Sequence, residues 1–121
     1  STQNQEAFNR DIWVNARQIE ERWRERQGEL TSPQKKALAQ AYNHCALNFF
    51  GVDRGLYTQA VSRLRRLAPT EISDRLERYV RGERWLGYTV ASVLENSRKK
   101  ATRRAKSVLR SLQETLPDPL A

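Results

Sequence analysis

A run of cationic side chains near the C-terminal end is the strongest chemical signal in the sequence. Residues 98–110 contain seven basic residues and no acid. Ammonium and guanidinium groups donate charge-assisted hydrogen bonds to phosphate oxygens, so this density of positive charge is typical of phosphate binding. A charged helix face is usually only a solvated face, but here no acid compensates the charge. The residues expected to bind an anion are Arg98, Lys99, Lys100, Arg103, Arg104, Lys106 and Arg110.

A second basic cluster, Arg63, Arg65 and Arg66, is the next candidate for phosphate contacts. The chain has 17 Arg and 5 Lys, and an arginine guanidinium bonds two phosphate oxygens at once, which lysine cannot do. The same bias would follow from a GC-rich coding sequence, so it is weak support. The arginines of residues 10–26 and 75–84 alternate with acids and are interpreted as solvated faces.

Three aromatic residues fall off the main apolar stripes and are candidates for stacking on unpaired bases: Trp13, Trp85 and Tyr88. Burial or a protein contact is the favoured interpretation for these residues, and stacking on a base is the alternative. Four others lie on the stripes and are assigned to the core: Phe8, Trp23, Tyr42 and Phe49.

The sequence offers little for catalysis. His44 and Cys45 are the only base–nucleophile pair, and neighbours on a helix project about 100° apart, so they do not form a dyad. One Cys and one His also exclude a cysteine-based zinc site and a histidine-pair metal site. Gly51 and Gly55 are not followed by the Lys-Ser/Thr pair of a phosphate-binding loop. We therefore expect no enzymatic activity, no metal and no cofactor.

The elements that position these residues are predicted to be helices. Apolar residues recur at three- and four-residue steps along the chain, and no alternating strand pattern is present. Gly28, Ser32-Pro33, Asp53 and Thr70 mark helix ends or starts. The helices are expected over 3–27, from Ser32 to about residue 50, from Asp53 to Pro69, from Thr70 to about Gly82, and over 83–115. The expected fold class is all-α, a four- or five-helix bundle with a long C-terminal basic helix.

The last predicted helix separates charge from apolar surface. At 100° per residue, Lys99, Arg103, Lys106 and Arg110 span about 60° of its circumference, and we call them the basic ridge. The apolar stripe lies on the other side and comprises Val90, Leu94, Ala101, Ala105, Val108, Leu109 and Leu112. The pattern predicts that the stripe anchors the helix while the ridge faces solvent. A helix over 83–115 would be about 50 Å long, so its C-terminal half is expected to project or to pack on a partner.

The core residues follow from the same periodicity. Six residues are predicted to be mostly buried: Leu38, Tyr42, Leu64, Leu76, Leu94 and Val108.

Length and composition agree with a small soluble protein. The 121 residues indicate one helical domain over 1–121, with 117–121 as a short non-helical tail. Only 38% of the residues are hydrophobic, which predicts a thin core, and a formal net charge of +8 favours an anionic partner. No apolar run approaches the roughly 20 residues that span a bilayer. A polar stretch over residues 1–10 and a lone Cys predict a cytoplasmic location.

These observations together favour a nucleic-acid-binding protein that contacts phosphates and does not read bases. RNA or single-stranded DNA is the favoured ligand, and a duplex is an alternative. Such a protein would be an accessory factor or a small subunit of a larger nucleoprotein complex, with protein partners and no membrane. The small helical subunits of CRISPR effector complexes are one example of this kind of protein, although no motif diagnostic of that family is present.

Three alternatives remain open at this point. The basic face could dock on an acidic protein partner, which would make the chain an adaptor. It could bind a membrane surface, but residues 98–112 lack Trp and Phe. A helix-turn-helix is conceivable over residues 53–81, although Pro69 and the poor turn spacing disfavour it.

Overall fold

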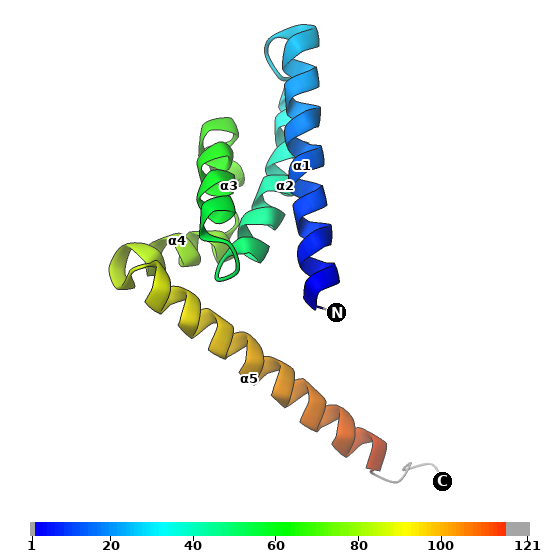
Figure 1. Ribbon diagram of the computed structural model, residues 1–121, viewed down its shortest axis with the longest axis vertical. Helices are drawn as coiled ribbons and strands as arrows, with labels where there is room; N and C mark the ends of the chain where they lie inside the picture. The colour runs from blue at the N-terminus through cyan, green and yellow to red at the C-terminus, as the bar shows by residue number, and fades with distance from the viewer. Residues whose placement is uncertain (1, 116–121) are drawn as a thin grey trace.

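The computed structural model describes residues 2–115, which fold into five α-helices and one 3-10 turn with no strand (Figure 1). The elements are α1 (Thr2–Gln27), α2 (Ser32–Phe49), α3 (Arg54–Leu67), η1 (Pro69–Glu71), α4 (Asp74–Leu86) and α5 (Tyr88–Thr115). The predicted all-α fold with a long C-terminal helix is confirmed. The predicted tail at 117–121 lies outside the described residues.

Local caps set the ends of the first two helices. Gly28, with a φ of 77°, ends α1 as predicted, and its N–H donates to the Arg24 carbonyl at 2.8 Å. The cap of α2 is Thr31 and not Ser32. The Thr31 hydroxyl accepts from the Gln34 N–H at 3.3 Å, and the Gln34 side chain accepts from the Thr31 N–H at 3.0 Å. This reciprocal capping box places Ser32 inside the first turn.

The start of α4 differs from the prediction. Asp53 caps α3 as expected, since its carboxylate accepts from the Leu56 N–H at 3.0 Å. Pro69 then opens the short turn η1, and this turn contains Thr70. The residue that caps α4 is Ser73, whose hydroxyl accepts from the Leu76 N–H at 3.2 Å.

The end of α4 also differs, because Gly82 does not stop the helix. The helix continues to Leu86, and the break occurs at Gly87, which has a φ of 81°. A side chain on Gly82 would lie 3.6 Å from the Ala91 Cβ. This is an ordinary packing distance, so Gly82 is an interior helical residue on the side of α4 that faces α5, and Gly87 makes the turn between the two helices.

The core surrounds α2, which packs against α1, α3 and α4. Leu38, Tyr42, Leu64 and Leu76 are buried, as predicted. Trp13, one of the three candidates for stacking on a base, is buried, in agreement with the favoured interpretation.

The aromatic residues of α1 and α2 differ in their burial. Trp13 packs edge-on against Tyr42 and Phe49. Trp23 is half-buried, whereas Phe8, assigned to the core, is exposed.

The face of α5 that packs on the other helices is not the predicted apolar stripe. Leu94 is 55% exposed and Val108 is 58% exposed, so the prediction that they are buried is wrong. The small residues Ala91 and Ser92 face the body and are buried. Beyond its first turns α5 leaves the other helices and extends away from them (Figure 1), and every described side chain from Lys100 onward is exposed. None of the described helices is long and apolar enough to cross a bilayer.

Candidate nucleic-acid interface

An aromatic contact anchors the start of α5. The Tyr88 hydroxyl accepts a hydrogen bond of 2.9 Å from the Gly51 N–H. Its ring lies edge-on to Phe50 with centroids 5.4 Å apart, and the Arg54 guanidinium lies 5.0 Å from the ring centre. Tyr88, a sequence candidate for base stacking, therefore ties α5 to the turn between α2 and α3.

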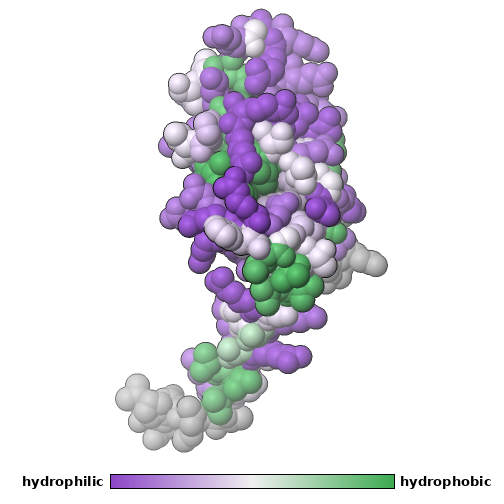
Figure 2. Space-filling model, turned by 90° about the vertical axis from the view of Figure 1, so that its left-hand side faces the viewer, coloured by the Kyte–Doolittle hydropathy of each residue, from purple (hydrophilic) through white to green (hydrophobic). Residues whose placement is uncertain are grey.

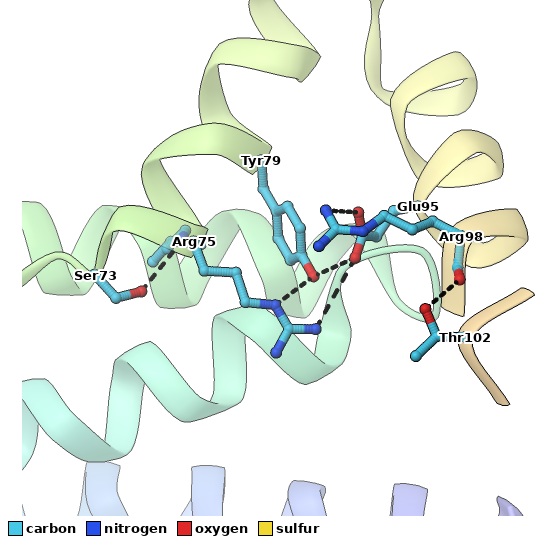
Figure 3. Close-up of polar contacts among 7 residues, drawn as sticks. Ser73, Arg75, Tyr79, Glu95, Arg98 and Thr102 are labelled. Atoms are coloured by element: carbon cyan, nitrogen blue, oxygen red, sulfur yellow. Dashed lines mark hydrogen bonds and ion pairs between the residues drawn. The ribbon is translucent and has the colours of Figure 1, made fainter. Parts of the chain in front are cut away.

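A polar network fastens the next turns of α5 to α4 (Figure 3). The Tyr79 hydroxyl donates to the Glu95 carboxylate at 2.9 Å and accepts from Arg75 Nε at 3.0 Å. Glu95 also forms ion pairs with Arg75 at 3.9 Å and with Arg98 at 3.8 Å. Burial, followed by the hydrogen bond to Glu95, raises the pKa of Tyr79, so the hydroxyl remains a donor at neutral pH.

Lys99 belongs to the same junction. Its ammonium lies 6.0 Å from the centre of the Tyr79 ring, within the range of a cation–π contact. Burial and the nearby charge of Arg75 lower the pKa of Lys99. The first two members of the basic run, Arg98 and Lys99, are thus engaged within the fold.

The remaining bases of the run are exposed and unpaired. Within residues 2–115 none of them forms an ion pair with a carboxylate: α5 has no acid between Glu95 and Glu114, and Glu114, four residues after Arg110, is not paired with it. We call these residues the exposed bases of α5: Lys100, Arg103, Arg104, Lys106 and Arg110. From the first to the last they extend about 15 Å along the helix axis. This segment is a cationic rod that stands clear of the body.

Arg63 has an internal role. Its guanidinium lies 3.7 Å from the Glu20 carboxylate and 5.8 Å from the centre of the Trp13 ring. Glu20 also accepts hydrogen bonds from the Tyr42 hydroxyl at 2.6 Å and from Arg24 Nε at 2.9 Å. Burial alone would raise the pKa of Glu20, but these hydrogen bonds and the two arginine charges lower it. Arg63 therefore compensates a largely buried carboxylate.

Arg65 and Arg66 line a groove of about 580 Å³ between α3 and α4, together with Arg81 and Arg84. The Tyr57 hydroxyl is buried in the wall of this groove and makes no hydrogen bond within the described residues. Arg66 also lines a smaller groove on the side of α1. Because acids alternate with Arg81 and Arg84 in the sequence, these two arginines were not predicted as site residues. Their three-residue spacing nevertheless places them on one face of the helix.

The ten predicted site residues divide between two separate surfaces. The contacts that α3 makes with α5 lie at the start of α5, where Arg54 and Tyr57 contact the Tyr88 ring, and in the described part of the chain the cluster at residues 63–66 does not join the run at 98–110. Trp85 is 82% exposed and remains a candidate for base stacking.

The helix-turn-helix alternative does not match the geometry. Residues 68–73 connect α3 to α4, and this connection is longer than the usual three- to four-residue turn.

Of the two residues considered for nucleophilic chemistry, Cys45 lies inside the bundle and His44 is half-buried. Cys45 is fully buried, and burial raises the pKa of its thiol to about 11, so the thiol is protonated at neutral pH. His44 Nε2 lies 3.2 Å from Asn9 Oδ1, and the Asn48 amide donates to the His44 carbonyl at 2.8 Å. The described residues contain no group of three or more acidic, His or Cys side chains placed to hold a metal ion.

Comparison of the chain with known protein families, curated proteins and solved structures gives no match. Its function is therefore argued from its own charges and geometry.

Proposed function

We propose that this chain binds nucleic acid through phosphate groups, largely independently of base sequence, with the exposed bases of α5. The observation that carries the proposal is that five bases lie on a projecting helix without any carboxylate partner among the described residues. Surface bases in a charge-balanced fold pair with nearby acids, as Arg24 does with Glu20. The exposed bases of α5 are available to an external anion instead.

Mutual repulsion makes an anionic ligand favourable along this helix. Lys100 and Arg104 are four residues apart, as are Lys106 and Arg110. Like charges at this spacing cost a few tenths of a kcal/mol per pair (about 0.2–0.5) in an isolated helix. A phosphate strand lying along α5 would remove this cost and would release condensed counterions.

The geometry supports an accessory factor or a small subunit more than an enzyme. The thiol of Cys45 is buried and protonated, and the charged surface is a projecting helix whose described side chains from Lys100 onward are all exposed. Trp85 is exposed and follows the groove residue Arg84 in the sequence, and its ring is available to stack on an unpaired base, which favours RNA or single-stranded DNA over a duplex.

A matched pair of variants tests the proposal. The first replaces Lys100, Arg103, Lys106 and Arg110 by Gln, and the second replaces Arg22, Arg26, Lys35 and Lys36 by Gln. Both remove the same charge from exposed positions that form no ion pair among the described residues. We expect the α5 variant alone to lose affinity for single strands, and to lose it equally for unrelated sequences, because phosphates carry no base information.

The same experiment separates nucleic-acid binding from the adaptor alternative. An adaptor that docks its basic face on an acidic protein would bind all nucleic acids weakly at physiological salt. Equal losses in the two variants would show that only net charge matters, and the proposal for α5 would be wrong.

A further inference from the structure

The groove between α3 and α4 carries more positive charge than its own acid balances. Its volume of about 580 Å³ lies in the range of sites that bind small molecules. Figure 2 views the molecule from the side of these helices, and hydrophilic side chains surround smaller patches of apolar surface on this face. The charged residues that line the groove are Arg65 and Arg66 from α3 and Arg81, Glu83 and Arg84 from α4. Four guanidinium groups and one carboxylate leave an excess of three positive charges.

Three of the four arginines have no carboxylate partner in the described part of the chain. Arg65, Arg66 and Arg84 are exposed and form no ion pair there. Arg81 lies 4.0 Å from Glu77 in an exposed pair, which contributes little in water. Because the walls of a cleft concentrate the field of like charges, these groups attract an anion more strongly than they would on a flat surface.

The Tyr57 side chain adds a donor that the fold does not use. It lines the groove and is 1% exposed, and its hydroxyl forms no hydrogen bond within the described residues. Burial, followed by the charge of Glu83, raises the pKa of Tyr57, so the hydroxyl keeps its proton at neutral pH. Buried polar groups are almost always paired, and an unpaired one is costly. A ligand oxygen in the groove would supply the missing acceptor.

A phosphate monoester fits this set of donors better than other common anions. It carries nearly two negative charges at neutral pH and three acceptor oxygens. It can therefore accept from guanidinium groups on both walls and from a hydroxyl at the same time. A carboxylate offers one charge and two oxygens in one plane, and a phosphodiester within a strand also carries one charge.

We propose that the groove between α3 and α4 binds a phosphate monoester, the group carried by a free nucleoside monophosphate or by the phosphorylated end of a strand. Arg65 and Arg84 would hold the phosphate from the two walls, and the Tyr57 hydroxyl would donate to one of its oxygens. Val61 and Val80 also line the groove and would contact the apolar part of the molecule that bears the phosphate. This inference rests on the groove and not on nucleic-acid binding by α5, so each is tested separately.

The test compares three ligands that share one nucleoside and differ in their phosphate. Adenosine 5′-monophosphate is a monoester, cyclic 3′,5′-adenosine monophosphate is a diester with one charge, and adenosine has no phosphate. Calorimetric titration of the full chain measures the binding of each. We expect the monoester to bind, and the diester and adenosine to bind at least about tenfold more weakly. A peptide of four glutamates, which shows whether any anion suffices, should also bind at least about tenfold more weakly.

Paired variants locate the binding surface. Arg65→Gln with Arg84→Gln changes the groove, and Arg22→Gln with Arg26→Gln removes the same charge from exposed positions on α1. We expect the groove variant to bind adenosine 5′-monophosphate about tenfold or more weakly and the α1 variant to bind it as the wild type does. The variant that removes four of the exposed bases of α5 should also keep wild-type affinity for this nucleotide. Circular dichroism verifies that all three remain folded.

Tyr57→Phe separates a ligand contact from a structural role. We expect this variant to bind adenosine 5′-monophosphate about tenfold more weakly. Its melting temperature should be unchanged or higher, because the hydroxyl has no hydrogen bond within the fold to lose. A hydroxyl that only stabilised the fold would show the reverse, a lower melting temperature with unchanged affinity.

A single strand with and without a 5′-phosphate distinguishes the two sources of the monoester. If the ligand is a strand end, the 5′-phosphate should raise the affinity of the wild type but not that of the groove variant. If the two strands bind equally while adenosine 5′-monophosphate binds in the groove, the ligand is a free small molecule.

Three outcomes would overturn the inference. The first is that adenosine 5′-monophosphate does not bind and the 5′-phosphate adds nothing to the affinity of a strand. The second is that the cyclic diester or the glutamate peptide binds as tightly as the monoester. The third is that the groove variant and the α1 variant lose the same affinity.

Discussion

The Tyr79 hydroxyl on α4 donates a 2.9 Å hydrogen bond to the carboxylate of Glu95 on α5. The same carboxylate pairs with Arg75 and Arg98, so it neutralises the first base of the basic run. The helix is held to the body up to this point, and the unpaired positive charge begins beyond Lys99. The contact between Tyr79 and Glu95 therefore marks the boundary between the part of α5 that stabilises the fold and the part that is free to bind.

Removing Glu95 is predicted to loosen the junction of α4 and α5. In Glu95→Gln the ion pairs with Arg75 and Arg98 are lost, whereas in Tyr79→Phe only the hydroxyl is lost. We expect the free energy of unfolding to fall by about 1–3 kcal/mol in the first variant and by about 1 kcal/mol in the second. Urea unfolding followed by circular dichroism measures both. Unchanged stability in both variants would show that the network does not hold α5.

Because the apolar stripe of α5 does not pack on the body, we expect the substitution of Leu38 and that of Leu94 to have different effects on stability. Leu38 is buried in the core, so Leu38→Ala should cost about 2–5 kcal/mol in the free energy of unfolding. Leu94 is exposed, and Leu94→Ala should change stability by no more than about 0.5 kcal/mol. Thermal unfolding of the two variants gives the comparison. A large loss in Leu94→Ala would mean that the stripe packs on the body after all.

Glu20 predicts an acid-dependent loss of stability. Its pKa lies below the ordinary value of 4.5 in the folded state, so the unfolded chain binds the proton more readily. The contribution of Glu20 is therefore present above the unfolded-state pKa and is lost as the pH falls through the folded-state value. We expect the stability difference between the wild type and Glu20→Gln to shrink between about pH 6 and about pH 3. A difference that is constant over this range would contradict the prediction.

The burial of Cys45 predicts that its thiol is alkylated slowly in the native protein. The thiol is fully buried and its pKa is raised to about 11, so little thiolate is present or accessible at neutral pH. Iodoacetamide followed by mass spectrometry should label the chain rapidly in urea and very slowly in native buffer. Rapid labelling of the native protein would show that the interior around α2 is open.

Substitution of two arginines predicted as site residues should affect different properties: one should change nucleic-acid affinity and the other should change the free energy of unfolding. Arg103 is exposed and unpaired among the described residues, whereas Arg63 compensates Glu20. Arg103→Gln should weaken binding to a single strand and keep stability, since it also removes repulsion within α5. Arg63→Gln should lower stability and leave binding nearly unchanged. The opposite pattern, measured by fluorescence anisotropy and urea unfolding, would move the interface to α3.

Local signals in the sequence were sufficient for the fold class and for several helix ends. Gly28 and Asp53 act as predicted because a left-handed glycine and a side-chain cap work within one turn. The choice between Gly82 and Gly87 needed tertiary information, since both glycines follow the apolar stripe of α4 and only the structure shows that Gly87, with a φ of 81°, makes the turn. Likewise, periodicity showed that α5 is amphipathic but not which of its arcs contacts the body.

The sequence predicted which residues carry the positive charge of the candidate site, but not which of them form ion pairs within the fold. The exposed bases of α5 follow from a local absence of acids, which the sequence shows directly. The link between Arg63 and Glu20 joins residues that are far apart in the chain, so no spacing rule revealed it. Arg81 and Arg84 were assigned to a solvated face because neighbouring acids balance them in sequence, although they line a groove in space.

The salt dependence of single-strand binding tests the central claim most directly. The log–log slope of affinity against salt concentration changes by about 0.7 for each phosphate contact to a single strand. Replacing Lys100, Arg103, Lys106 and Arg110 by Gln should therefore make the slope shallower by nearly three, about 4 × 0.7. The matched variant at Arg22, Arg26, Lys35 and Lys36 should keep the wild-type slope. A wild-type slope and affinity in the folded α5 variant would contradict the account.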